Sequence, residues 1–264
     1  MSQVRRLPDH LVNKIAAGEV VERPASVVKE LVENAIDALA TVVAIDLKDA
    51  GRQLIRVVDD GTGMTPEDLL LALERHTTSK WSSEAELDEI ASLGFRGEAL
   101  AAICSVSRFS ILSQARGEAR GSLVRGAGGT IVDRLPVEAA DGTSVEISDL
   151  FFNTPARLKF LRSRQTELAA SLRLVSQLAL AHPGVQLRVT HNGKPLLTAP
   201  RASNLRDRIG SLLGFGVAEK LLPVRWEEHG LSVSGFITPP ALSRGNRDEL
   251  TVIVNGRPVR DNLL

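Results

Sequence analysis

The alternation of apolar and polar residues between positions 24 and 40 predicts an amphipathic helix, which Pro24 suits as a first-turn residue. One stripe of this helix is apolar and consists of Val28, Leu31, Val32, Ala35 and Leu39. The opposite stripe is acidic and consists of Glu30, Glu33, Asn34 and Asp37, with no Lys or Arg to pair its carboxylates. The helix therefore has one face for a core and one face of unusual chemistry.

A bound cation explains the crowded acidic stripe better than helix stability does. Like charges one turn apart cost a helix roughly a few tenths of a kcal/mol per pair. Glu30 and Asn34 are four positions apart, so both side chains reach toward one point. There the amide oxygen of Asn34 suits magnesium and the carboxylate of Glu30 suits activation of a water. A solvated acidic face remains the alternative.

The rest of the chain alternates between strand and helix patterns, which predicts a mixed α/β fold. Strands are predicted at 42–48, 53–58, 108–114, 122–125, 130–135, 144–147, 231–238 and 249–254, and a hairpin at 185–197 around Asn192-Gly193. Helices are predicted at 9–17, 65–75, 84–91, from 98 onward, at 166–181 and at 205–213. A boundary is expected at 200–203, and residues 261–264 resemble the start of a helix that is cut off, so we expect a fragment.

Composition narrows the class of protein. A chain of 264 residues with 43% apolar residues can bury a large core, in one large or two modest domains. No apolar run approaches the ~20 residues that span a bilayer, and residues 1–9 lack the apolar centre of a signal peptide. The single cysteine, Cys104, excludes a disulfide within the chain and a cysteine zinc site. We therefore expect a cytoplasmic protein without a membrane segment.

Charge is unevenly distributed although the net charge is zero. Residues 1–150 carry 16 Lys and Arg against 24 Asp and Glu, and residues 151–264 carry 16 against 8. The basic residues of the second part include Arg157, Lys159, Arg162, Arg164, Arg206, Arg208, Arg257 and Arg260. Such a distribution is typical of sequence-nonspecific contact with the phosphates of a nucleic acid, although solvated surface arginines give the same pattern.

Three glycine-containing segments suit a nucleotide. Asp59 ends a predicted strand just before Gly61 and Gly63, where a flat base can lie against the backbone and a carboxylate can accept a hydrogen bond from the exocyclic amine of adenine. A plain turn is the alternative. The segment 94–97 offers backbone N–H groups before a helix, and Gly142-Thr143 places a hydroxyl at the start of a strand. Neither of these two is specific alone.

The order of these motifs resembles the ATP-binding superfamily shared by DNA gyrase, the ninety-kilodalton heat-shock chaperone, histidine kinases and MutL. The motifs are Glu30 with Asn34, Asp59-Asp60-Gly61-Thr62-Gly63, Gly94-Phe95-Arg96-Gly97 and Gly142-Thr143. Longer strings resemble the MutL family in particular: residues 15–24, 94–100, 150–157 and 254–257. The resemblance runs from about residue 7 to residue 264, and there is no P-loop motif.

The resemblance implies a role for each matching residue. Glu30 would be the general base, Asn34 the magnesium ligand, and Glu33 and Asp37 supporting members of the same motif. Asp59 would bind adenine with Gly61, Gly63 and Thr143 nearby. The phosphates would be covered by Gly94, Phe95, Arg96 and Gly97, and by a mobile lid that includes Thr78, Ser79 and Lys80. Without the family, these last three would be interpreted as a polar surface loop.

The resemblance also implies an architecture and partners. The fold would be a two-layer α/β sandwich of the Bergerat type over residues 1–202, with an N-terminal arm, followed at 203–264 by the start of a domain like that of ribosomal protein S5. Family members bind Mg-ATP, dimerise when ATP is bound, bind DNA nonspecifically, and act with the mismatch-recognition protein MutS and a downstream nuclease or helicase. DNA contacts are expected from Arg157, Lys159, Arg162, Arg164, Arg257 and Arg260.

The sequence leaves two other functions open. A lysine that reaches the γ-phosphate in family members would come from beyond Leu264, so turnover is expected to be slow. The chain would then be a nucleotide-gated module for DNA or protein interaction without useful turnover. A relative of the gyrase ATPase subunit is the third possibility, which the MutL-like strings disfavour.

Overall fold

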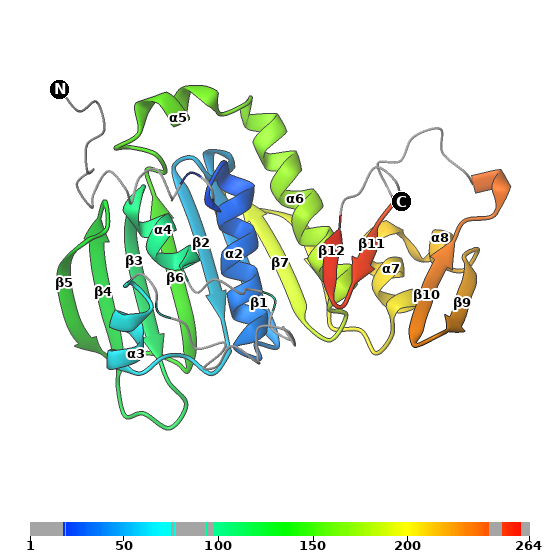
Figure 1. Ribbon diagram of the computed structural model, residues 1–264, viewed down its shortest axis with the longest axis horizontal. Helices are drawn as coiled ribbons and strands as arrows, with labels where there is room; N and C mark the ends of the chain where they lie inside the picture. Colours follow the sequence, from blue (N-terminus) through cyan, green and yellow to red (C-terminus); the bar gives the residue numbers. More distant parts are fainter. Residues whose placement is uncertain are drawn as a thin grey trace, which may run out of the picture.

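The main body of the protein is one eight-stranded sheet with helices packed against it (Figure 1). The computed structural model describes residues 18, 20–74, 77, 93, 98–242 and 250–259. The strand order is β5-β4-β3-β6-β2-β1-β7-β8, and of the pairs described in this sheet β1 with β7 is parallel and the others are antiparallel. The strands are β1 (Val42–Lys48), β2 (Leu54–Asp59), β3 (Arg108–Gln114), β4 (Gly121–Ala127), β5 (Thr130–Val137), β6 (Gly142–Ser148), β7 (Gln186–His191) and β8 (Lys194–Ala199). The expected two-layer α/β sandwich is confirmed.

The helical layer is formed mainly by α2 (Pro24–Asp37), α4 (Ala99–Ser105) and α6 (Arg164–Ala181), with α3 (Pro66–Leu71) beside β3 and β4 and α5 (Pro155–Phe160) leading into α6 (Figure 1). Helix α2 packs on β2 and against α6, and Val27, Val28 and Val32 are fully buried there. Since the sheet-facing residues of β1 and β2 are also buried, these elements share one apolar core.

The chain after β8 forms smaller elements and a second, small core. They are α7 (Leu205–Leu213), α8 (Phe215–Ala218), the hairpin of β9 (Leu222–Glu228) with β10 (Leu231–Ile237), a short 3-10 helix (Pro240–Leu242), and the hairpin of β11 (Val252–Val254) with β12 (Arg257–Val259). Ile209, Ala218 and Leu221 are buried together. Most side chains of β9 and β10 are exposed.

The sequence predicts some element bounds correctly and misses others. The bounds of β1, β3 and α7 agree with the prediction, and Asn192 and Gly193 have φ of 50° and 78°, as a tight hairpin turn requires. Helix α2 ends at Asp37, because Leu39 has φ of 60°, and its side chain is 70% exposed, so its assignment to the apolar stripe is wrong. The α-helices and strands without a predicted counterpart are α5, α8, β9 and β12. The short 3-10 helices at Asp49–Gly51 and Pro240–Leu242 were not predicted either. The predicted helices at 9–17 and 84–91 lie outside the described residues.

In the described part of the chain, no helix combines the length and apolar character needed to cross a membrane.

Candidate functional site

Asp59 ends β2 in the middle of the sheet, opposite Thr143 of β6. Its Oδ1 accepts a hydrogen bond from the backbone N–H of Gly61 at 2.9 Å, and the backbone N–H of Thr143 donates to the carboxylate as well. Burial raises the pKa of Asp59 above its usual range, and these two hydrogen bonds oppose the rise only in part. An ionised carboxylate has about four lone-pair positions, so further acceptor capacity remains for a ligand.

Ser113 of β3 is a member of this site that the sequence did not reveal. Its side chain is 1% exposed, and its Oγ lies 2.8 Å from Oγ1 of Thr143. The same Oγ accepts from the backbone N–H of Met64 at 2.9 Å and lies 3.1 Å from the carbonyl oxygen of Gly142. A serine within an alternating strand gives no sequence signal, but here it fixes the Thr143 hydroxyl beside Asp59.

Asp60, the neighbour of Asp59, anchors the loop instead of facing a ligand. Its Oδ1 accepts from the backbone N–H groups of Thr41 and Val42 at 2.7 and 2.8 Å, and its Oδ2 accepts from the Thr41 hydroxyl at 2.6 Å. Burial opposes ionisation of Asp60, but these hydrogen bonds outweigh it and lower the pKa of its carboxyl. Two adjacent carboxylates thus have pKa shifts of opposite sign.

Gly61 and Gly63 are required by contacts within the protein. A Cβ at Gly61 would lie 2.8 Å from the carbonyl oxygen of Ala38, at the end of α2. A Cβ at Gly63, where φ is +66°, would lie 1.9 Å from the carbonyl oxygen of Gln114. The backbone N–H of Thr62 donates to that Ala38 carbonyl at 2.9 Å. The interpretation that these glycines make room for a ligand is therefore incomplete, because the loop is clamped between α2 and β3.

The polar face of α2 carries Glu30 and Asn34 one turn apart, as predicted. The prediction that no cation pairs its carboxylates is wrong, because Nζ of Lys29 lies 3.2 Å from Oε1 of Glu30 and 3.1 Å from Oε2 of Glu33. The long lysine side chain reaches both from the flank of the stripe. Burial lowers the pKa of Lys29, but the two carboxylates outweigh it, so that this pKa is raised.

Glu33 and Asp37 do not lie on a freely solvated face. Glu33 is 4% exposed, and burial raises its pKa although Lys29 opposes the shift. Oδ1 of Asp37 accepts a hydrogen bond from the backbone N–H of Leu93 at 2.8 Å, which ties the end of α2 to the residue before the glycine segment. The predicted phosphate-side residues lie outside the described part: Thr78, Ser79, Lys80, Gly94, Phe95, Arg96 and Gly97.

The basic residues fall into two groups. Arg157 and Lys159 lie on α5, the Arg162 side chain is exposed, and Arg164 is 72% exposed and forms an ion pair with Asp49. Arg257 is partly exposed on β12, and Arg260 lies outside the described residues.

Arg206 and Arg208 do not add to a basic surface, so that part of the expectation is wrong. Arg206 donates to the carbonyl oxygens of Ala218 and Leu221 at 3.2 and 3.1 Å. Arg208 is 0% exposed and donates to two carbonyl oxygens at 2.8 and 2.6 Å. Arg206 thus binds residues of the second core, whereas Arg208 ties α7 to the connection between α6 and β7, at Pro183 and Val185. Sequence alone does not separate such arginines from surface ones.

Within the described residues, no group of three His, Cys, Asp or Glu side chains converges on a point that could hold a metal ion. A magnesium ion here would need ligands other than a protein cage, as magnesium commonly has when it is bound with phosphates and waters.

Comparison with known families defines the class of protein. Residues 22–124 match the family of histidine kinase-, DNA gyrase B- and HSP90-like ATPases, and residues 209–264 match the C-terminal domain family of DNA mismatch repair proteins. The first match includes α2, the Asp59 loop and Ser113. The fold and this site therefore define an ATPase domain of the gyrase and heat-shock chaperone class.

Individual relatives narrow the class further. The DNA mismatch repair protein MutL of Geobacillus kaustophilus is 47% identical over 260 residues, which cover 98% of this chain and 41% of that protein, and MutL of Listeria innocua is 48% identical over 255 residues. A solved structure, the Aquifex aeolicus MutL ATPase domain complexed with ADP, has a TM-score of 0.73 and 31% identity, covering 92% of this chain and 85% of that one. This chain belongs to the MutL family of DNA mismatch repair proteins. It spans about two fifths of the length of the Geobacillus and Listeria proteins.

Proposed function

We propose that this chain is the N-terminal ATPase region of a MutL protein, which binds ATP with magnesium and hydrolyses it between α2 and the end of β2. The observation that carries the proposal is the half-buried Asp59 carboxylate, held at a strand end with the Thr143 hydroxyl beside it. Further support comes from the similar Aquifex aeolicus domain, which was solved with ADP.

On the base side, Asp59 accepts a hydrogen bond from the exocyclic amine of adenine, and Thr143 with Ser113 supplies the neighbouring polar contact. Guanine presents a carbonyl oxygen at that place, which would face the carboxylate and repel it. The end of β2 therefore selects adenine.

On the phosphate side, Glu30 orients and deprotonates the attacking water, and the amide oxygen of Asn34 would be the side-chain ligand of a bound magnesium ion. Magnesium would neutralise charge on the phosphates. Lys29 holds the Glu30 carboxylate in place through their ion pair. The segment Gly94–Gly97 and the lid at Thr78, Ser79 and Lys80 cover the phosphates.

Calorimetric titration with a nonhydrolysable ATP analogue and magnesium tests this proposal. The wild-type chain should bind saturably, and Asp59→Asn should lose about tenfold or more in affinity, because the amide presents a donor where the carboxylate accepted. Glu146→Gln, which breaks the exposed Arg56–Glu146 pair on β6, is the matched control and should bind normally. An intact fold without nucleotide binding would contradict the proposal. Binding without turnover would favour the nucleotide-gated module.

Membership of the MutL family supports a proposal for the wider assembly. We propose an ATP-binding unit at 1–202, with an N-terminal arm and the lid, and an S5-like unit beginning at 203. The two hydrophobic clusters and the family matches at 22–124 and 209–264 support this division. In the cytoplasm, ATP binding would close the lid and promote a homodimer that acts with MutS and with a downstream nuclease or helicase in mismatch repair.

DNA binding is proposed for the basic residues at 157–164, of which Lys159, Arg162 and Arg164 are exposed, with Arg257 and Arg260 as further candidates. Such phosphate contacts are sequence-nonspecific and weaken steeply with salt. The double change Arg162→Glu with Arg164→Glu should lower affinity for duplex DNA and flatten the salt dependence, measured by fluorescence anisotropy. Arg225→Glu, at a side chain 84% exposed on β9, is the control. An unchanged salt slope would exclude Arg162 and Arg164 from the interface.

A further inference from the structure

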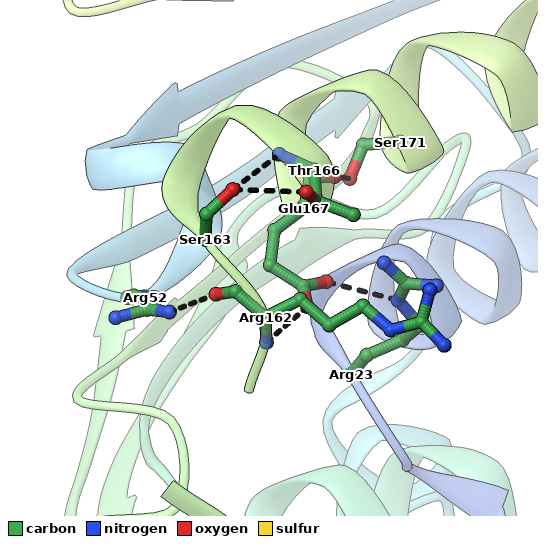
Figure 2. Close-up of polar contacts among 7 residues, drawn as sticks. All are labelled: Arg23, Arg52, Arg162, Ser163, Thr166, Glu167 and Ser171. Atoms are coloured by element: carbon green, nitrogen blue, oxygen red, sulfur yellow. Dashed lines mark hydrogen bonds and ion pairs between the residues drawn. The ribbon is translucent and has the colours of Figure 1, made fainter. Parts of the chain in front are cut away.

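A single buried carboxylate, Glu167 of α6, joins the beginnings of two helices (Figure 2). Its side chain is 1% exposed. Its Oε2 accepts from Nε of Arg23 at 2.9 Å, and its Oε1 accepts from the backbone N–H of Arg162 at 2.9 Å. Arg23 directly precedes Pro24, where α2 begins, and Arg162 lies just before α6. Glu167 therefore connects the start of the helix that carries Glu30 to the end of the basic segment 155–164.

The basic segment is itself fixed to the body of the protein near this carboxylate. The guanidinium group of Arg52 donates to the carbonyl oxygen of Arg162, and Arg164 pairs with Asp49 (Figure 2 shows the first of these contacts). A Cβ at Gly18 would meet the guanidinium group of Arg157, so α5 also touches the chain before α2. A displacement of the basic segment 155–164 would consequently displace the start of α2 as well.

Helix stability alone does not account for Glu167. The N-terminus of α6 is already capped by the Ser163 hydroxyl, which accepts from the backbone N–H of Thr166 at 3.2 Å. An exposed acidic residue in the first turn would serve the helix dipole equally well. A buried charge is costly unless it is paired and hydrogen-bonded, so the burial of Glu167 is explained by its two partners.

We propose that Glu167 is a positioning residue for nucleotide turnover. Through Arg23 it holds the first turn of α2, and thereby Glu30, in its working position. Through Arg162 it transmits binding of a polyanion such as DNA at residues 155–164 to that helix. The inference rests on the proposed function, because it assigns the regulation of the same site.

The test compares wild type, Glu167→Gln and the control Glu146→Gln, with turnover and nucleotide-analogue affinity measured with and without duplex DNA. The glutamine retains an acceptor for Arg162 but loses the charge facing Arg23. We expect turnover to fall about tenfold, nucleotide affinity to stay within about twofold, and the effect of DNA on turnover to disappear. Arg23→Lys, which keeps a positive charge opposite Glu167, should retain more of the DNA effect. Arg23→Gln, which removes that charge, should lose the DNA effect and replaces Glu167→Gln if that variant does not fold.

A role limited to structure would lower the melting temperature and reduce all activities in proportion to the folded fraction, with the effect of DNA intact. That result, or wild-type turnover that DNA does not alter, would overturn the inference while leaving the proposed function in place. Absence of nucleotide binding by folded wild type would instead contradict the proposed function.

Discussion

The two sides of the proposed nucleotide site are held in place by different interactions. The base side, at the end of β2, depends on backbone contacts: Gly61 and Gly63 fit against carbonyl oxygens, and Asp59 accepts from backbone N–H groups. The catalytic side, on α2, depends on side-chain charges, with Lys29 pairing two carboxylates. Substitutions that add a Cβ should therefore damage the base side, and substitutions that remove a charge should damage the catalytic side.

The largest expected effect is on the catalytic side. Glu30→Gln removes the proposed base while keeping the size of the side chain, so turnover should fall by about 10²–10⁴-fold. Nucleotide binding should remain, because the base side is unchanged. Steady-state phosphate release and calorimetry measure the two quantities. A parallel loss of binding and turnover would mean that the two sides are not separable.

Gly63→Ala should destabilise the base side through a steric conflict. It places a methyl group against the Gln114 carbonyl at a backbone with φ of +66°, so unfolding free energy should fall by about 2 kcal/mol or more. Gly117→Ala is the matched control, since φ there is +87° but no atom lies within 4 Å of the added Cβ. Urea denaturation of both variants separates backbone strain from steric conflict, and equal losses would refute the clamp at Gly63.

Asp60→Ala should destabilise the same loop without acting on the nucleotide directly. The change removes three hydrogen bonds from Thr41 and Val42, which should cost about 1–2 kcal/mol at neutral pH. Because the pKa of Asp60 is lowered in the fold, this stabilisation is present above 3.8 and is lost as the pH falls through the folded pKa below that value. Thermal unfolding at several pH values checks both statements. A destabilisation that persists well below that pKa would contradict them.

The effect on the free energy of unfolding should be smallest for ionisation of Asp59, and its sign is opposite to that for Asp60. Its pKa is raised in the fold, so its ionised form costs stability above that pKa, and the cost is relieved as the pH falls toward 3.8. Adenine binding needs the ionised form, so analogue affinity should weaken on acidification already at a pH above 3.8. Asp59→Asn should lack this pH dependence in calorimetric titrations. An identical pH profile in wild type and variant would assign the effect elsewhere.

The candidate residues of the site are easier to find in the sequence than the contacts that hold them in place. Glu30 and Asn34 stand out because they lie on a crowded acidic stripe of a predicted helix, and Asp59 stands out because it ends a predicted strand just before two glycines. Ser113 and the buried Glu167 depend on partners from distant segments, which no local pattern encodes.

The same limit applies to the fold. The bounds of β1 and β3 were predicted correctly. Strand β9 was missed because Pro223 and consecutive glutamates obscure its alternation. Exposed α5 has no buried residue to give it helical periodicity.

The parallel pairing of β1 with β7 has a consequence for synthesis of the chain. The Thr190 hydroxyl donates to Asp46 across this pair from 144 positions away in sequence. Until β7 has left the ribosome, β1 is an unprotected edge in the middle of the future sheet, and such edges invite pairing with other chains. Contacts of this sequence separation also slow folding. The nucleotide site, although its motifs all lie before residue 150, thus acquires its complete sheet only after β7 and β8 have been synthesised.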